Sequence, residues 1–254
     1  MEIITSKSNP IVKYACELKD KKSSQKYGQC LVESEKIIHD LLVSKVKVET
    51  LLISSDKVSK YESLRSLHTG KTYFISPEIS KYLGETVTPS GVFAFVQIPK
   101  ASMAHKNFLV LENIQDPSNL GAILRSAKAF DYNDIILISG VYPYSPKVIR
   151  SSMGYVFDSN IVDMTIDELK EYLSRHNFML YCADMDGFDV IDTPPTSTRY
   201  GIVFGNEGNG VSLGLKSICN SVVSIPMQNN VESLNVSVSA GIIMYNLNNI
   251  NKEK

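Results

Sequence analysis

Short, almost purely apolar runs recur along the chain, and the segments between them are long enough to form helices. In the second half of the sequence these runs contain very few polar residues, which is typical of parallel strands covered by helices on both faces. They are Phe108–Leu111, Asp134–Ser139, Phe178–Ala183, Gly201–Gly205 and Val222–Pro226. The pattern predicts an α/β domain built on a parallel sheet.

The first part of the chain shows the same alternation on a smaller scale. Its β-forming runs are Cys30–Ser34, Val48–Ser54, Lys71–Ser76 and Gly91–Ile98. Helical patterns separate them, so we predict a small α/β/α domain over residues 1–98. Residues 99–106 are polar and aperiodic and are predicted to be a linker, which leaves residues 107–254 for the second domain.

Charge is distributed unevenly between the two predicted domains. Residues 1–106 contain 16 lysines and arginines against 11 aspartates and glutamates, whereas residues 107–254 contain 10 against 16. Lys19, Lys21 and Lys22 belong to a lysine-rich stretch that suits the phosphate backbone of a nucleic acid. An ordinary solvated surface explains the same lysines equally well, so charge alone leaves both interpretations open.

Composition excludes several other classes of protein. The chain is 43% hydrophobic and 21% charged, as globular proteins are, and no apolar run approaches the roughly 20 residues that cross a bilayer. The N-terminus has no apolar signal core, so we expect a cytoplasmic protein. The four cysteines form no C-x-x-C pair and lie near no histidine at zinc-ligand spacing, which predicts free thiols and no metal site.

Three unusual segments follow predicted strands of the second domain, where parallel α/β sheets bind their ligands. They are ENIQDPSNLGAILR at 112–125, IVFGNEGNGVS at 202–212 and IPMQNNVESLNVSVSAGIIMY at 225–245. Local structure explains part of each, since Asp116 or Ser118 can cap a helix and glycines permit a tight turn. A serine-capped buried helix is the plain interpretation of the third segment. The glycine spacing fits neither a dinucleotide-binding fingerprint nor a P-loop.

Together and in this order, the three segments resemble the three signature motifs of the SpoU (TrmH) family within the SPOUT methyltransferases. A fourth segment, KVIRSSMG at 147–154, resembles the arginine-containing segment between the family's first and second motifs. The resemblance covers residues 107–247. Residues 1–98 resemble, more weakly, the ribosomal-protein-like RNA-binding domain that precedes the catalytic domain in many members. The implied activity is S-adenosylmethionine-dependent methylation of a ribose 2′-hydroxyl in RNA.

The resemblance also implies an architecture. The family's catalytic domain contains a deep trefoil knot, an exception to the rule that chains do not thread their own loops. The knot loops hold the methyl donor in a bent conformation, and the backbone around Gly205, Ile225 and Leu234 is expected to contact it here. The family works as a homodimer with the active site at or near the subunit interface, so a homodimer is expected.

The reaction that the resemblance implies directs attention to Arg125. Methylating a hydroxyl requires proton removal, charge stabilisation and alignment. The family's matching arginine has been proposed as the base, but a guanidinium stays protonated in proteins. We therefore expect Arg125 to stabilise the developing oxyanion and to engage an adjacent RNA phosphate, while that phosphate or solvent takes the proton.

The remaining motif residues are expected to orient the reacting groups or to bind RNA. Asn119, Glu207 and Asn235 would orient by hydrogen bonds, and Glu207 could instead act as a base if it is buried. Arg150 is expected to bind an RNA phosphate. Ser233 is expected to contact the substrate, although capping of its helix explains it as well.

Three functions stay open at this level. A ribosomal RNA 2′-O-methyltransferase is favoured by the lysine-rich first domain, on family analogy. A tRNA enzyme or an antibiotic-resistance methylase acting on ribosomal RNA would use the same chemistry. A non-catalytic RNA-binding or ribosome-assembly protein is disfavoured, because a pure binder has no need of Asn119, Arg125, Glu207 and Asn235 together. Single-stranded or looped RNA is the expected target, since its ribose is accessible.

Overall fold

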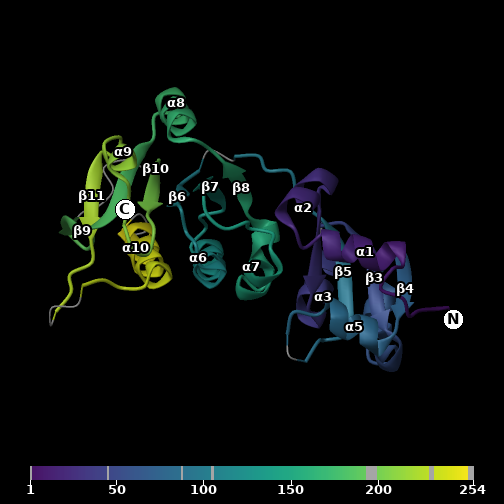
Figure 1. Ribbon diagram of the computed structural model, residues 1–254. Coiled ribbons are helices and arrows are strands. Elements are labelled where there is room, and N and C mark those ends of the chain that lie inside the picture. Colours follow the sequence, from purple (N-terminus) through teal and green to yellow (C-terminus); the bar gives the residue numbers. More distant parts are fainter. Residues whose placement is uncertain are drawn as a thin grey trace. The chain divides into compact units, whose positions relative to one another are not determined.

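The computed structural model describes residues 2–44, 46–86, 88–103, 106–192, 199–228 and 232–250. Its contacts divide the chain into two compact units, each a sheet with helices packed on it (Figure 1). The first unit comprises Met1–Pro99 together with Tyr142–Phe157, and the second comprises Lys100–Val141 together with Asp158–Lys254. Nothing in the sequence indicates that residues 142–157 group with the first unit.

A five-stranded mixed sheet forms the centre of the first unit, in the order β1-β4-β3-β5-β2. The pairs β1–β4 and β3–β4 are parallel, whereas β5 runs antiparallel to both β3 and β2. The strands are β1 (Ile3–Ile4), β2 (Gln29–Glu33), β3 (Val48–Ser54), β4 (Lys71–Ile75) and β5 (Val92–Gln97). The helices are α1 (Pro10–Glu17), α2 (Lys21–Tyr27), α3 (Glu35–Val43), α4 (Glu62–Leu67), α5 (Pro77–Leu83) and α7 (Pro146–Ser151), with short 3₁₀ turns at Ser55–Lys57 and Tyr155–Asp158.

Apolar side chains from the sheet and from α1 and α5 form the core of this unit. Val12, Leu52, Ile79 and Phe93 are among its fully buried members. The helix α7 packs against β2 within the same unit, far from β2 in sequence. The first unit therefore includes a helix from beyond the predicted linker. One strand–helix–strand passage, β6–α6–β7 (residues 108–138), lies between the linker and α7.

A six-stranded sheet forms the centre of the second unit, in the order β11-β9-β10-β6-β7-β8. Every neighbouring pair is parallel, as the apolar runs predict. The strands are β6 (Phe108–Glu112), β7 (Asp134–Ile138), β8 (Asn160–Asp163), β9 (Met179–Asp189), β10 (Tyr200–Phe204) and β11 (Ser221–Ser224). The helices are α6 (Pro117–Ala129), α8 (Ile166–His176), α9 (Leu213–Lys216) and α10 (Val236–Ile250).

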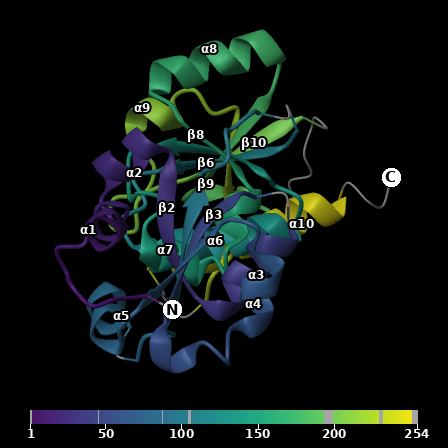
Figure 2. The same cartoon turned by 90° about the vertical axis from the view of Figure 1, so that its right-hand side faces the viewer.

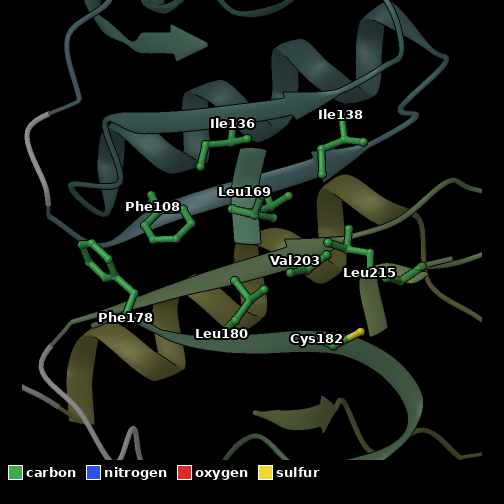
Figure 3. Packing of buried hydrophobic residues seen from close by; sticks show 11 residues of the cluster. Phe108, Ile136, Ile138, Leu169, Phe178, Leu180, Cys182, Val203 and Leu215 are labelled. Carbon is green, nitrogen blue, oxygen red and sulfur yellow. The ribbon is translucent and has the colours of Figure 1, made fainter. Parts of the chain in front are cut away.

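Helices cover both faces of this sheet: α8 and α9 lie over one face, and α6 and α10 over the other (Figures 1 and 2). Successive side chains along each strand point to opposite faces of the sheet, so each strand packs against the helices on both sides. Phe108 and Val110 pack with Leu169 of α8 and Leu215 of α9, in the cluster drawn in Figure 3, while all of Phe108–Glu112 is buried. This arrangement confirms the predicted α/β/α parallel-sheet domain. The deep trefoil knot stays a prediction.

Some details differ from the sequence-based expectations. The last helix begins at Val236 rather than at Ser233, and the short strands β1 and β8 carry too few residues to form a recognisable pattern. The cysteines at 16, 30, 182 and 219 are free thiols, as their spacing predicts. Among the described helices, none is long and apolar enough to cross a membrane.

Candidate functional site

A pocket of about 540 Å³ lies in the second unit, at the carboxyl ends of β10 and β11 and beside the middle of β9. Its size falls within the range of small-molecule sites. Its walls come from the middle of β9, from the ends of β10 and β11 and the segments that follow them, and from the residues just before and at the start of α10. The described lining residues are Ala183, Asp184, Met185, Phe204, Gly205, Asn206, Glu207, Gly208, Asn209, Gly210, Val223, Ser224, Ile225, Met227, Glu232, Ser233, Leu234, Asn235, Val236, Ser239 and Ile243.

The turn after β10 is held in a compact shape by Asn206. Its side-chain oxygen accepts hydrogen bonds from the backbone N–H groups of Gly208 (2.9 Å) and Asn209 (3.1 Å), and its side-chain nitrogen donates to the Asn113 carbonyl (3.0 Å). A Cβ atom at Gly205 would lie only 2.2 Å from the Gly210 backbone, so no other residue fits there. The glycine-rich segment is therefore a closed loop that places the side chain of Glu207 on its outer edge.

The first motif brings Asn119 to this loop. Asp116 caps α6 by accepting a hydrogen bond from Ser118 N at 2.8 Å, and Pro117 occupies the first helical position. Asn119 therefore lies in the first turn of α6. Its side-chain nitrogen donates a hydrogen bond to Oε1 of Glu207 at 3.0 Å, which joins the first motif to the second.

Asn235 joins the third motif to the same pair. Its side-chain nitrogen donates to Oδ1 of Asn119 at 2.9 Å, and its own oxygen accepts hydrogen bonds from the backbone N–H (2.9 Å) and the hydroxyl (2.6 Å) of Ser237. One hydrogen-bonded row, Asn235–Asn119–Glu207, thus links residues more than 80 positions apart in sequence. Glu207 and Asn235 are exposed and line the pocket, and the half-buried Asn119 lies between them, bonded to both.

The carboxylate of Glu207 is held in its charged form. Partial burial acts to raise the pKa of Glu207, but hydrogen bonds from the Asn119 side chain and from the backbone N–H groups of Glu207 itself, Asp116 and Gln115 outweigh it. The pKa is therefore below its ordinary value. A carboxylate with a lowered pKa is a weak base, so the alternative that Glu207 acts as the catalytic base loses its physical support.

Two models of protein families match the chain. The SpoU rRNA methylase family matches residues 106–245, more than half of the chain, and the MRM3-like substrate-binding domain matches residues 9–94. The chain belongs to the SpoU rRNA methylase family.

Individual relatives match over nearly the whole length. The chain is 28% identical to the Bacillus subtilis 23S rRNA (guanosine(2553)-2′-O)-methyltransferase, over 97% of this chain and 99% of that protein. It is 30% identical to an uncharacterised tRNA/rRNA methyltransferase of Synechocystis, over 95% and 92%. The crystal structure of an AdoMet-bound rRNA methyltransferase from Sinorhizobium meliloti shares the fold, with a TM-score of 0.85 at 22% identity, over 98% of this chain and 97% of that one.

The residues that the SpoU resemblance assigns to the donor all line the pocket. Gly205, Ile225 and Leu234 come from the three segments that form its walls, and Ser233 lies beside Leu234. Because α10 begins at Val236, Ser233 precedes the helix by more than the single position of a capping residue. Capping of α10 therefore does not explain Ser233.

Arg125 lies apart from the network of the SpoU motifs. It is exposed on α6, it is not among the pocket-lining residues, and its side chain makes no hydrogen bond or ion pair with the part of the chain that the structure describes. Six helical positions after Asn119 place it about 9 Å further along the helix and about 120° around it. The guanidinium is thus free to meet a group outside this chain.

Four of the residues expected to bind RNA, the three lysines and Arg150, are in the first unit, at two places. Lys21 and Lys22 are exposed in the first turn of α2. Lys19 and Arg150 both approach the carboxylate of Glu85, with nitrogen–oxygen distances of 3.7 and 3.5 Å. The sequence does not indicate that these two cations meet, since Lys19 belongs to the first predicted domain and Arg150 to the second.

Sequence reasoning missed Asp184 and Lys216, which form an ion pair of 2.7 Å at the pocket. The register of β9 against β11 shifts here, from Cys182↔Val222 to Phe188↔Val223, so five residues of β9 have no partner on β11, and three of the five line the pocket. Burial acts to raise the pKa of Asp184, but the hydrogen bond and charge of Lys216, together with the backbone N–H groups of Met185 and Asp186, outweigh it and the pKa is lowered. The acidic run ADMDG after an apolar strand is the signal that could have indicated this.

Proposed function

We propose that this chain transfers a methyl group from S-adenosylmethionine to a ribose 2′-hydroxyl of ribosomal RNA. The observation that carries the proposal is the hydrogen-bonded row Asn235–Asn119–Glu207, which joins the three motifs of the SpoU family at the rim of a ligand-sized pocket. Membership of the family supports methyl transfer, and the name of the Bacillus subtilis relative supports 23S ribosomal RNA as the substrate. An RNA substrate and four free thiols fit a cytoplasmic enzyme.

The chemistry of the pocket suits a cationic donor. Its described lining includes three carboxylates, those of Asp184, Glu207 and Glu232, and no lysine or arginine. When bound, S-adenosylmethionine supplies an electrophilic methyl group on a positively charged sulfur, and the surplus of negative charge on these residues attracts that cation. The backbone around Gly205, Ile225 and Leu234 provides the neutral hydrogen-bonding groups that would hold the rest of the molecule.

The side chains at the rim would align the nucleophile rather than deprotonate it. Asn119 and Asn235 hold each other and Glu207 in one geometry, so each amide has its orientation fixed before the RNA arrives. The ionised Glu207 carboxylate can accept a hydrogen bond from a ribose hydroxyl and so direct the oxygen lone pair. Preorganised groups of this kind contribute to catalysis because they need no rearrangement during the reaction.

We further propose that the enzyme is a homodimer and that Arg125 completes a site at the subunit interface. Arg125 is exposed and lies outside the hydrogen-bonded row of its own chain. Val238 and Tyr245 lie on one face of α10, are 49% and 55% exposed, and suit burial against a second copy. A different face of α10 packs on α6 of the same chain, where Gly241 lies beside Ser126.

The direct test is transfer of radiolabelled methyl groups from S-adenosylmethionine to RNA. The purified chain should label a protein-free transcript of 23S ribosomal RNA, and mapping of 2′-O-methyl positions should give one discrete site. Bulk tRNA serves as the alternative substrate, because the Synechocystis relative is named for both RNA classes. Labelling of tRNA alone would show that the substrate is tRNA and not ribosomal RNA. If neither RNA is labelled, and ribosomal particles are not labelled either, the proposed activity is refuted.

Mixing two inactive variants tests the shared site. Arg125→Ala and Asn119→Ala should each strongly lower the rate of transfer, and sedimentation should give about twice the chain mass of 28.2 kDa for both. If Arg125 acts across the interface, a mixed dimer contains one site with both residues intact, so mixing should restore a substantial fraction of the activity. Arg125 acting within its own chain would leave the mixture inactive.

A further inference from the structure

We propose that Lys19 and Arg150 form a single binding site for an RNA phosphate, and that the carboxylate of Glu85 occupies this site until RNA displaces it. The proposal rests on the proposed function only in taking RNA as the ligand. Its basis is a meeting of charges inside the first unit: Lys19 Nζ lies 3.7 Å from Oε1 of Glu85, and Arg150 Nη1 lies 3.5 Å from Oε2. One carboxylate thus faces two cations, and the cluster carries a net positive charge.

The fold, independently of Glu85, fixes the ammonium group of Lys19 and the backbone that carries Arg150. Lys19 Nζ donates a hydrogen bond to the carbonyl of Leu83, the last residue of α5, at 2.6 Å. Arg150 belongs to α7, whose Val148 and Ile149 are buried and which packs against β2. Their side chains remain 23% and 29% exposed, so both charges are confined yet open to solvent. A site for a phosphate needs this combination of fixed position and access.

The loop that carries Glu85 is anchored independently of its carboxylate. Glu33, only 7% exposed, accepts hydrogen bonds from the backbone N–H groups of Glu85 (3.1 Å) and Ser90 (3.2 Å) and from the hydroxyl of Thr86 (3.4 Å). The backbone of Glu85 is therefore held by a buried group, whereas its side chain makes only two long ion pairs. The carboxylate can swing away while the loop keeps its structure.

The hydrogen-bonding capacity of the cluster also favours an incoming anion. A lysine ammonium has three N–H donors and an arginine guanidinium has five. Within the described residues, Lys19 uses its donors on Leu83 and Glu85, and Arg150 bonds through its side chain to Glu85 alone. A phosphodiester shares one negative charge between two non-bridging oxygens, which a guanidinium can bind side by side while the ammonium group donates to either of them.

The experiment compares Glu85→Gln with Glu49→Gln in the full chain. Glu49 is a matched control, because it lies in the same unit, pairs with one lysine (Lys47, 2.6 Å), and has the same side-chain exposure of 33% as Glu85. Glutamine keeps the backbone N–H that Glu33 binds, so neither variant should alter the melting temperature by much. The probe is a fluorescein-labelled uridine 20-mer, titrated at several salt concentrations.

We expect Glu85→Gln to bind the 20-mer about threefold to tenfold more tightly than wild type at low salt, because two weak ion pairs no longer compete with the phosphate. The slope of log affinity against log salt should steepen by about 0.7, one phosphate contact on a single strand. Glu49→Gln should change affinity by less than about twofold, the effect of net charge alone. Adding Lys19→Gln or Arg150→Gln to Glu85→Gln should return the slope to the wild-type value.

Equal effects of the two glutamine variants would overturn the proposal, since Glu85 would then be an ordinary surface ion pair. Weaker binding by Glu85→Gln would overturn it as well, because the carboxylate would be part of the RNA surface rather than its competitor. Methyl transfer to the 23S transcript is measured in parallel. If the wild type transfers no methyl group but Glu85→Gln still binds the 20-mer more tightly, the proposed function is refuted and the phosphate site is supported.

Discussion

Each of the two units has a carboxylate at the centre of a polar cluster, and the two carboxylates differ in the charge of their partners. Glu207 in the second unit is held by neutral donors, the amide of Asn119 at 3.0 Å and backbone N–H groups at 3.4 Å. Glu85 in the first unit faces two cations, Lys19 and Arg150, at 3.7 and 3.5 Å. The first cluster therefore keeps a negative charge, and the second keeps a positive one.

The difference matches the two ligands that the proposed reaction brings together. A cationic methyl donor is attracted to a pocket whose described charged residues are all carboxylates, and an anionic RNA is attracted to a surface where cations outnumber carboxylates. It also bears on the role that we propose for Arg125. The described charged residues of the pocket are all carboxylates, which do not stabilise a developing oxyanion, whereas Arg125 is an exposed cation without a described partner.

The largest expected effect comes from removing that cation. Arg125→Ala should lower the rate of methyl transfer about 100-fold to 1,000-fold, the usual cost of losing one preorganised oxyanion donor. Donor affinity should stay nearly unchanged, because the charge that Arg125 stabilises appears only in the transition state. Single-turnover transfer and calorimetry with S-adenosylmethionine measure the two quantities.

Arg125→Lys distinguishes stabilisation from base catalysis. A lysine keeps the charge but lacks the planar fork that can hold a phosphate and the nascent oxyanion together, so we expect it to be nearly as impaired as alanine. Its rate relative to wild type should not rise with pH. A steep rise toward the wild-type rate at alkaline pH would show that this position removes the proton.

The next largest effect tests whether neutral donors around Glu207 matter. Asn119→Asp keeps the shape of the side chain but sets a second carboxylate against Glu207, and should lower transfer about 10-fold to 100-fold at neutral pH. Two adjacent carboxylates raise one pKa, so protonation restores a donor as pH falls. The rate relative to wild type should therefore recover between about pH 7 and pH 5.

The wild type should show no such transition from Glu207. Its lowered pKa keeps the carboxylate ionised throughout this range, and the stabilisation it gives is lost only as pH falls through that lowered pKa. Asn119→Ala is the control, since alanine cannot be protonated and should stay impaired at every pH. Parallel pH profiles of the Asp and Ala variants would contradict the role assigned to the Asn119–Glu207 hydrogen bond.

How far the sequence could predict this arrangement differs between the units. The second unit follows from local patterns: apolar strands specify a parallel sheet, and polar segments after the strands must meet at its carboxyl edge. The row Asn235–Asn119–Glu207 is therefore foreseeable as a cluster, although its hydrogen bonds are not. Asp184 was missed because it enters the pocket through an irregular excursion of β9, and periodicity cannot indicate where a strand leaves its register.

The first unit depends on a contact that no local pattern encodes. Its strands are predictable, but the packing of α7 on β2 joins segments more than 100 residues apart, and only that packing brings Arg150 to Glu85. The family resemblance assigns Arg150 a role without indicating its neighbours. Long-range pairing of surface charges is decided by tertiary structure, so the Glu85 cluster could not be deduced from the lysine count of the first domain.

A smaller effect should come from the exposed lysines of the first unit. Lys21→Gln/Lys22→Gln should weaken binding of the uridine 20-mer several-fold and lower the salt slope by up to about 1.4, two phosphate contacts on a single strand. Donor affinity should not change. The matched control is Lys128→Gln/Lys170→Gln, which removes the same charge from the second unit, and an equal loss of slope there would move the RNA surface away from α2.

The smallest expected effect concerns the charge of the pocket itself. Asp184 lies at 17% side-chain exposure and pairs with Lys216, so Asp184→Asn leaves an ammonium without its partner beside the donor. Because the pair is partly exposed, we expect donor affinity to fall only about twofold to fivefold. S-Adenosylhomocysteine, which lacks the positive charge on sulfur, should lose much less affinity.

Calorimetry with both ligands distinguishes an effect of charge from an effect of shape. The double variant Asp184→Asn/Lys216→Gln should recover the affinity for S-adenosylmethionine because no uncompensated cation remains. If both ligands weaken equally and the double variant does not recover, Asp184 supports the shape of the β9 excursion, and the contrast between an anionic donor pocket and a cationic RNA surface would lose one of its three carboxylates.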